Sequence, residues 1–169
     1  MINLFFSTGI RQRSAIYLKV KDVDVENQLL HVNVTKNRKP LLVPLSSSML
    51  RILQEYLKYR QYQNEEEYLF CTVFGSQLKK SSVYYELYHY NKNRGIERTG
   101  IHRYRHTFAK QWILNGGNVV TLSKILGHSS LDITQNYLNL LVSDVGKEVE
   151  ELNLLDKFST KQKIKMKKK

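Results

Sequence analysis

Apolar and polar residues alternate near the start of the chain and recur at longer intervals elsewhere. The alternation runs through residues 20–34, where Glu26 and Asn27 mark a turn, and a further apolar run covers residues 41–45. A period of two is typical of strands that bury one face. This region therefore predicts two or three antiparallel strands.

Most of the remaining chain has apolar residues three and four positions apart, which is typical of amphipathic helices. Residues 1–6 resemble the last turns of a helix, and Arg11 stands at the head of a second helical run. Residues 46–48 offer serine N-caps for the next helix. Further helices are predicted over residues 81–93, capped by Ser81 and Ser82, and over residues 101–115, 119–126, 134–140 and 145–155. We expect an α+β fold, mainly α-helical with a small antiparallel β-sheet.

The composition adds a strong positive charge to this picture. The 169 residues carry a formal net charge of +12 and are 41% hydrophobic, enough for one domain with a proper core. This charge favours a polyanionic partner, either nucleic acid or an anionic membrane surface. Because no apolar run approaches the roughly 20 residues that span a bilayer, we expect nucleic acid as the partner and no membrane.

The last residues differ in composition from the rest. Residues 157–169 hold seven lysines and no acid, which is typical of a flexible tail or a loose electrostatic arm for phosphates. We therefore expect one folded unit over residues 1–156 and a lysine-rich tail over 157–169. Cys71 is the single cysteine and residues 1–6 lack the features of a secretory signal, so a cytoplasmic location is expected.

Two polar clusters interrupt the helical pattern. The first is HRYRH, with His102 and Arg105 about 60° apart on the flank of an apolar stripe, so that both can point into a partly buried cleft. The second is LGHSSLDITQNY, which places His128 nine residues before Tyr137. Imidazoles, a guanidinium and a phenol in one cavity would suit chemistry on a phosphodiester.

A metal site and a nucleotide-binding loop are less consistent with the sequence. His102 and His106 have the spacing of metal ligands, but Arg103 and Arg105 between them oppose a bound dication, and the glutamate of zinc-protease helices is missing. Two adjacent glycines after the helix over 101–115 lack the lysine and serine of a phosphate-binding loop. We expect no metal and no nucleotide cofactor.

In order and spacing, these motifs resemble the catalytic domain of the tyrosine recombinases, the phage integrase family, up to about Ser143. The first family motif is STGIR, followed by the hairpin motif VTKNRKPLLVPLS, then HRYRHTFA, LGHSS and the nucleophile nine residues later. These motifs supply Arg11, Lys36, His102, Arg105, His128 and Tyr137 in turn.

The resemblance implies a metal- and ATP-independent DNA strand transferase. Tyr137 would attack the scissile phosphorus to form a 3′-phosphotyrosine intermediate and release a 5′-hydroxyl. Lys36 would protonate the leaving 5′-oxygen, and His102 would act in proton transfer with the tyrosine. The activity implied is recombination, that is, DNA integration or excision, by a protein of bacterial or phage origin.

Binding roles follow from the same resemblance. Arg11 and Arg105 would hold the non-bridging phosphate oxygens, and His128 would donate a further hydrogen bond to them. The hairpin turn that carries Lys36 is basic, which is equally typical of a solvated loop. Further contacts with double-stranded DNA are expected from Arg13, Arg38, Lys39 and Arg103.

Two departures from the family pattern define the alternatives. Ser14 stands where the family usually has a carboxylate, and the N-terminal core-binding domain of the family is missing before Met1, so we expect an N-terminally truncated protein. A catalytically weakened DNA-binding remnant and a type IB topoisomerase-like enzyme are the competing readings. The family implies a homo-tetramer on DNA, and the chain without DNA is expected to be a monomer. Residues 145–155 would pack either on a neighbouring protomer or on their own domain.

Overall fold

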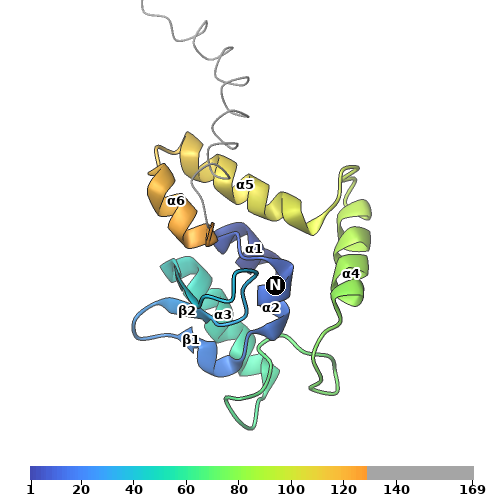
Figure 1. Ribbon diagram of the computed structural model, residues 1–169. Coiled ribbons are helices and arrows are strands. Elements are labelled where there is room, and N and C mark those ends of the chain that lie inside the picture. Colours follow the sequence, from blue (N-terminus) through green and yellow to red (C-terminus); the bar gives the residue numbers. More distant parts are fainter. Residues whose placement is uncertain (129–169) are drawn as a thin grey trace, which may run out of the picture.

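Helices make up most of the structure and flank one small sheet (Figure 1). The computed structural model describes residues 1–128, so the predicted helices over 134–140 and 145–155, Tyr137 and the lysine tail lie outside the described residues. The predicted fold class is confirmed. In order, the elements are α1 Ile2–Thr8, α2 Gln12–Tyr17, the 3₁₀ turn η1 Val20–Asp22, β1 Val23–Asp24, β2 Leu29–Val32, β3 Leu41–Pro44, α3 Ser47–Arg60, α4 Lys80–Lys92, α5 Ile101–Leu114 and α6 Val119–Leu126.

The three strands form an antiparallel sheet in the order β1-β2-β3. Leu30 lies opposite Val43 in the ladder, and both are fully buried in one cluster with Met49 and Leu53 of α3. Helix α3 therefore packs on the apolar face that the alternation predicts. The strands are shorter than the alternation suggests, because residues 20–22 form a 3₁₀ turn whose Asp22 accepts the Lys19 amide at 2.8 Å.

The predicted capping residues are confirmed at the start of α3 and at the end of α6, but not at the start of α4. Ser46 caps α3 by accepting the Met49 amide at 3.2 Å, and Gly127 ends α6 in the left-handed conformation. The prediction that Ser81 and Ser82 cap α4 is wrong. That helix already begins at Lys80, and its N-cap Lys79 makes no side-chain capping bond.

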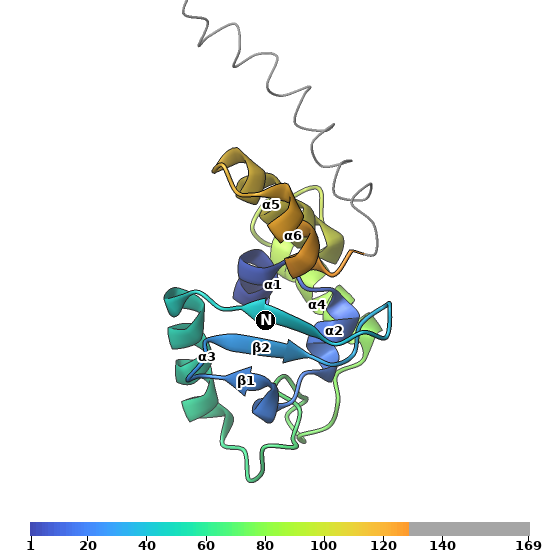
Figure 2. The same cartoon turned by 60° about the vertical axis from the view of Figure 1, so that its left-hand side comes forward.

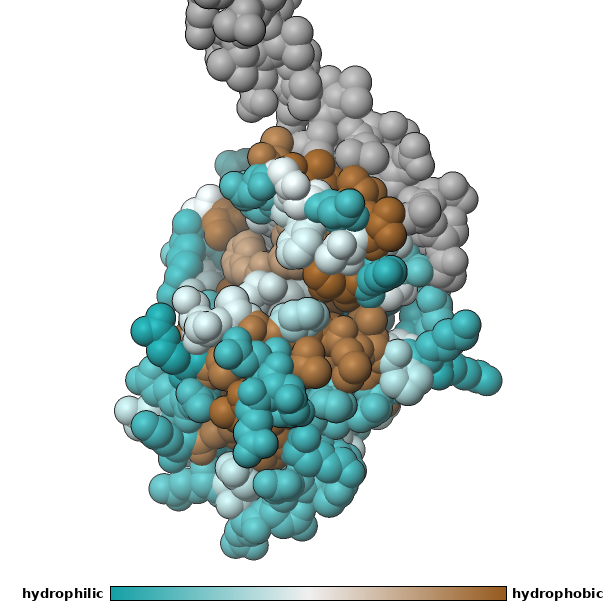
Figure 3. Space-filling view, turned by 90° about the vertical axis from the view of Figure 1, so that its left-hand side faces the viewer, coloured by the Kyte–Doolittle hydropathy of each residue, from teal (hydrophilic) through white to brown (hydrophobic). Residues whose placement is uncertain are grey.

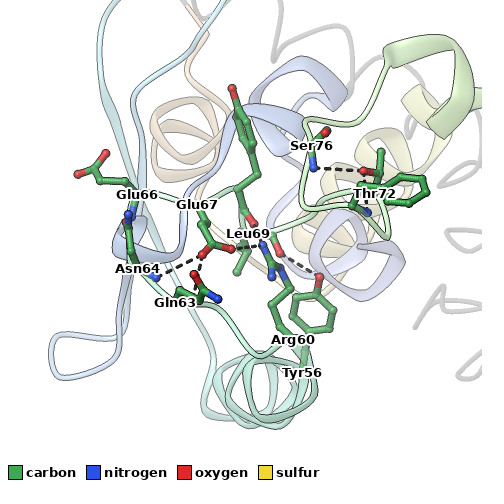
Figure 4. Close-up of polar contacts among 11 residues, drawn as sticks. Tyr56, Arg60, Gln63, Asn64, Glu66, Glu67, Leu69, Thr72 and Ser76 are labelled. Carbon is green, nitrogen blue, oxygen red and sulfur yellow. Dashed lines mark hydrogen bonds and ion pairs between the residues drawn. The ribbon is translucent and has the colours of Figure 1, made fainter.

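The long connection from α3 to α4 is held to the core by polar contacts (Figure 4). Arg60, at the end of α3, donates to Glu67 Oε2 at 2.9 Å and to the Tyr68 carbonyl at 3.2 Å. The Tyr56 hydroxyl donates to the Leu69 carbonyl at 2.9 Å. Hydrogen bonds from the Gln63 amide and then from Arg60 lower the pKa of Glu67 below its ordinary value. These contacts hold the connection in place, and Leu69, which is part of it, is fully buried in the core.

A second, smaller cluster joins α5 and α6 above α1 (Figures 1 and 2). Its buried members are Ala109, Leu122 and Leu126. In Figure 2 the sheet edge formed by β3 faces α6, and the two elements are in contact. The face seen in Figure 3 is hydrophilic over its lower part, where the sheet and α3 lie, and more apolar toward α5 and α6. Within residues 1–128, every helix is too short or too polar to cross a membrane.

Gly9 lies where α1, α5 and α6 converge. It ends α1 with φ 61°, and a Cβ there would lie 2.6 Å from Phe108 Cδ1 and 2.8 Å from Leu126 Cδ2. The turn that leads into Arg11 therefore needs a residue without a side chain, both for its backbone conformation and for the space.

Replacing Gly9 with alanine is expected to lower the free energy of unfolding by about 2–4 kcal/mol, because left-handed strain and overpacking add together. Urea unfolding measures this change. Gly116→Ala is the matched control, since Gly116 has φ 78° but open space around its Cβ position. That control should cost about 1 kcal/mol, the strain alone. Equal losses in the two variants would contradict the packing argument.

Candidate active site

Four separate parts of the chain meet around one cavity of about 290 Å³. They are the connection between α1 and α2, the β2–β3 hairpin, the middle of α5 and the end of α6. The lining residues are Ile10, Arg11, Ser14, Val32, Thr35, Asn37, Lys39, Pro40, Leu41, Arg105, Leu126, Gly127 and His128. Three of the six residues expected to do chemistry are therefore brought together, namely Arg11, Arg105 and His128.

Arg105 is the buried centre of this group, with 7% of its surface exposed. Helix α5 places it beside the apolar stripe, next to the buried Tyr104. Its guanidinium donates from Nη1 to the Gly9 carbonyl and from Nη2 to the Leu126 carbonyl, each at 2.8 Å. The planar fork thus joins the turn before Arg11 to the end of α6, and it keeps its charge at any physiological pH.

His128 follows directly on the end of α6. Gly127 turns the chain with φ 62°, and the His128 amide donates to the Ser123 carbonyl at 3.0 Å. The ring Nε2 lies 2.8 Å from Arg105 Nη2. Because a guanidinium can only donate, Nε2 must accept, which leaves the proton of the neutral imidazole on Nδ1. Burial first, and then the charges of Arg105 and Arg11, lower the pKa of His128 to about 4.

This pKa predicts a loss of stability in mild acid. The unfolded chain takes up a proton on His128 near pH 6.5, whereas the folded chain resists it down to about pH 4. The free energy of unfolding should therefore be constant above pH 6.5 with respect to this group and fall between pH 6.5 and 4. Urea unfolding across this range measures the slope. In His128→Gln the slope should shrink, with a remainder from His106, whose pKa is also lowered, chiefly by burial. An unchanged slope would contradict the assignment.

Arg11 is the N-cap residue of α2, with extended backbone at φ −76°. It is half-buried, lines the cavity, and its charge contributes to the lowered pKa of His128. The following residue, Gln12, is buried and donates to the Lys80 carbonyl at 2.7 Å, which fixes this corner against the start of α4. The structure therefore confirms that Arg11 stands at the head of a helix, with its side chain at the cavity.

The β2–β3 hairpin presents its two lysines in different surroundings. Lys36 is exposed and is not among the lining residues, whereas Lys39 contributes to the cavity. Thr35 Oγ1 donates to the Lys39 carbonyl at 2.8 Å and closes the turn, in which Arg38 has φ 57°. The Asn37 side-chain amide lies 3.5 Å from the Gly127 carbonyl. Thr35 and Asn37 were not expected at the site, and only their closeness to Lys36 in sequence could have indicated them.

In the HRYRH cluster on α5, His102 and Arg105 lie in different surroundings. His102 is exposed on α5 and lies outside the cavity lining, so of the pair expected to share a cleft only Arg105 lines it. Arg103 and Arg13 are also exposed, and the Arg13 guanidinium lies 5.9 Å from the centre of the Tyr17 ring. These side chains are available to a ligand larger than the cavity.

Comparison with known proteins bears on this arrangement. A sequence model of the phage integrase family matches residues 1–143. The tyrosine recombinase XerA of Saccharolobus solfataricus is 34% identical over 148 residues, which make up 88% of this chain and 47% of that protein. The chain thus spans about half the length of the curated relatives it matches.

Solved structures agree with the family match. A crystal structure of XerA recombinase superposes with a TM-score of 0.77 at 28% identity, covering 88% of this chain and 54% of that one. XerH site-specific recombinase, bound to its difH substrate in a pre-cleavage complex, gives a TM-score of 0.69 at 28% identity, covering 81% and 41%. The chain belongs to the phage integrase family, and its fold is that of the tyrosine recombinase catalytic domains.

Proposed function

We propose that this chain is the catalytic part of a site-specific recombinase that cleaves and rejoins double-stranded DNA through a 3′-phosphotyrosine. The observation that carries the proposal is the buried Arg105, which is fixed by two backbone carbonyls, contacts His128 Nε2 and shares one cavity with Arg11. The DNA-bound state of XerH, a relative in fold and sequence, supports DNA as the partner.

The cavity is suited to one phosphodiester group. Arg11 and Arg105 supply two permanent positive charges, and His128 in its neutral form supplies an Nδ1–H donor. Such donors stabilise the extra negative charge that builds up on the non-bridging oxygens of a pentavalent phosphorus. Because these groups are already oriented in the folded chain, they can stabilise this charge without a metal ion, and ATP is not needed because the phosphotyrosine keeps the energy of the broken phosphoester bond.

Cleavage exchanges one phosphoester bond for another. The Tyr137 oxygen forms a bond to phosphorus, the bond from phosphorus to the 5′-oxygen breaks, and the reverse reaction rejoins the strand. His102 takes the phenolic proton, and Lys36 gives a proton to the 5′-oxygen. Both side chains are exposed and lie outside the cavity lining, where a DNA backbone could reach them, and Lys39 is the hairpin lysine that lines the cavity.

Exposed basic residues make the DNA contacts beyond the scissile phosphate. Arg13, Arg38, Lys39 and Arg103 are all exposed on the described part of the chain. Phosphate contacts of this kind position the duplex without reading its sequence. A homo-tetramer on two duplexes, formed only on DNA, completes the proposed assembly.

Covalent trapping tests this function. The full chain is mixed with end-labelled duplexes that carry a nick and a randomised sequence around it, so that the short cleaved strand diffuses away and the adduct persists. We expect a labelled protein–DNA adduct on a denaturing gel in the presence of EDTA and without ATP. Sequencing the trapped DNA then reports the preferred site. Binding without any adduct would favour a DNA-binding remnant, and relaxation of supercoiled plasmid without strand exchange would favour a topoisomerase.

A further inference from the structure

Ser14 makes a hydrogen bond that connects two motifs of the site. Its side chain is buried on α2, three residues after Arg11, and Oγ donates to the Val34 carbonyl at 2.8 Å. The β2–β3 ladder ends at the pair Val32 and Leu41, so this carbonyl lies beyond the last pair of the sheet. Ser14 thus holds the outgoing hairpin arm two residues before Lys36.

The arm is also held one residue earlier, where the Asn33 side-chain amide donates to Asp22 Oδ1 at 2.9 Å, but the contacts nearer to Lys36 are weaker. The bond from Thr35 to the Lys39 carbonyl lies within the turn and does not tie it to the rest of the chain. The Asn37 amide reaches the Gly127 carbonyl only at 3.5 Å, and both Asn37 and Lys36 are exposed. The contact from Ser14 is therefore the short, largely buried tie between the hairpin arm and the helix headed by Arg11.

We propose that Ser14 is a positioning residue for strand cleavage, which holds the β2–β3 hairpin so that its lysine reaches the leaving 5′-oxygen. This inference rests on the proposed function. In this role the serine cannot be replaced by the acid usual in the family, because a carboxylate is an acceptor only and could not donate to the Val34 carbonyl. Restoring an acid by Ser14→Asp should therefore weaken cleavage instead of improving it.

The expected effect follows from the sensitivity of proton transfer to geometry. A displacement of about 1 Å can cost on the order of 100-fold in rate. Ser14→Ala should lower the rate of adduct formation by roughly 10- to 100-fold, less than the full loss of about 10²- to 10⁴-fold expected if general acid catalysis were removed altogether. Ser14→Thr, which keeps the hydroxyl donor, should retain most of the rate.

A substrate with sulfur in place of the bridging 5′-oxygen separates this role from a general loss of structure. A thiolate leaves without a proton, so the substrate needs no general acid. On a nicked duplex with the sequence recovered from the random pool, Ser14→Ala and Lys36→Ala should both be slow with oxygen and near wild type with sulfur. Ser14→Cys, nearly isosteric and a weaker donor, should show the same pattern to a smaller degree. Ser7→Ala is the matched control, since the Ser7 hydroxyl donates to the Leu4 carbonyl within α1.

The remaining outcomes would contradict either the positioning role alone or the proposed function as well. A normal rate of Ser14→Ala with the oxygen substrate, or a defect that the sulfur substrate does not relieve in Ser14→Ala and Ser14→Cys, overturns the positioning role alone. Failure of the wild-type chain to form an adduct with either substrate overturns the proposed function, and the positioning role with it. The two failures are distinguished by the wild-type lane.

Discussion

Replacing Tyr137 with phenylalanine is expected to abolish the covalent adduct with nicked DNA while leaving DNA binding unchanged. The substitution removes only the phenolic oxygen, which is the atom that would bond to phosphorus, and keeps the aromatic ring. Residual adduct should fall below detection, at least 1,000-fold under wild type, because no other residue in the proposed mechanism supplies the nucleophile. The measurement is the labelled band on a denaturing gel, together with a filter-binding assay of the same samples.

The chain offers a matched control for this substitution. Tyr59 is 79% exposed at the end of α3 and does not line the cavity, and Tyr59→Phe removes the same atom there. Its adduct yield should equal that of wild type. An adduct that persists in Tyr137→Phe would mean that another side chain is the nucleophile and would remove the basis for the proposed function.

Arg105→Lys is expected to produce the second largest loss. A lysine keeps one charge but cannot reach the Gly9 carbonyl, the Leu126 carbonyl and a phosphate with a planar fork. Adduct formation should fall by about 100- to 1,000-fold, the cost of removing one donor that stabilises the transition state. The free energy of unfolding should fall as well, by about 1–3 kcal/mol for the buried carbonyls left without a partner.

Arg103→Lys provides the comparison for this second prediction. Arg103 is on the same helix but exposed, so Arg103→Lys should leave stability unaltered. The variant keeps the positive charge that its proposed contact with a DNA phosphate needs, so adduct formation should stay within about threefold of wild type. Measuring both variants by adduct yield and urea unfolding separates the buried arginine from the positive charge of the helix. Similar effects of the two substitutions would show that burial of Arg105 does not matter for cleavage.

Local features of the fold could be predicted well where a residue acts on its immediate neighbours. Ser46 as an N-cap, Gly127 as a helix end and the turn at Glu26 and Asn27 all depend on the conformation of a few adjacent residues. The same reasoning failed at Ser81 and Ser82, because α4 already begins at Lys80 and its N-cap residue makes no side-chain capping bond. There the contact of Gln12 with the Lys80 carbonyl fixes the first turn, and that contact joins residues 68 positions apart.

The sequence by itself determined the family motifs, their order, the helical and strand segments and the expectation of a basic, phosphate-binding site. It could not determine which of these residues share a cavity, because Arg105 contacts Gly9 across 96 positions and Leu126 across 21. Only the tertiary structure showed that burial and two arginines lower the pKa of His128, that Lys39 lines the cavity while Lys36 is exposed, and that Ser14 donates to the Val34 carbonyl. Periodicity and capping depend on near neighbours, whereas burial, pKa shifts and hydrogen bonds between motifs arise only when distant segments pack together.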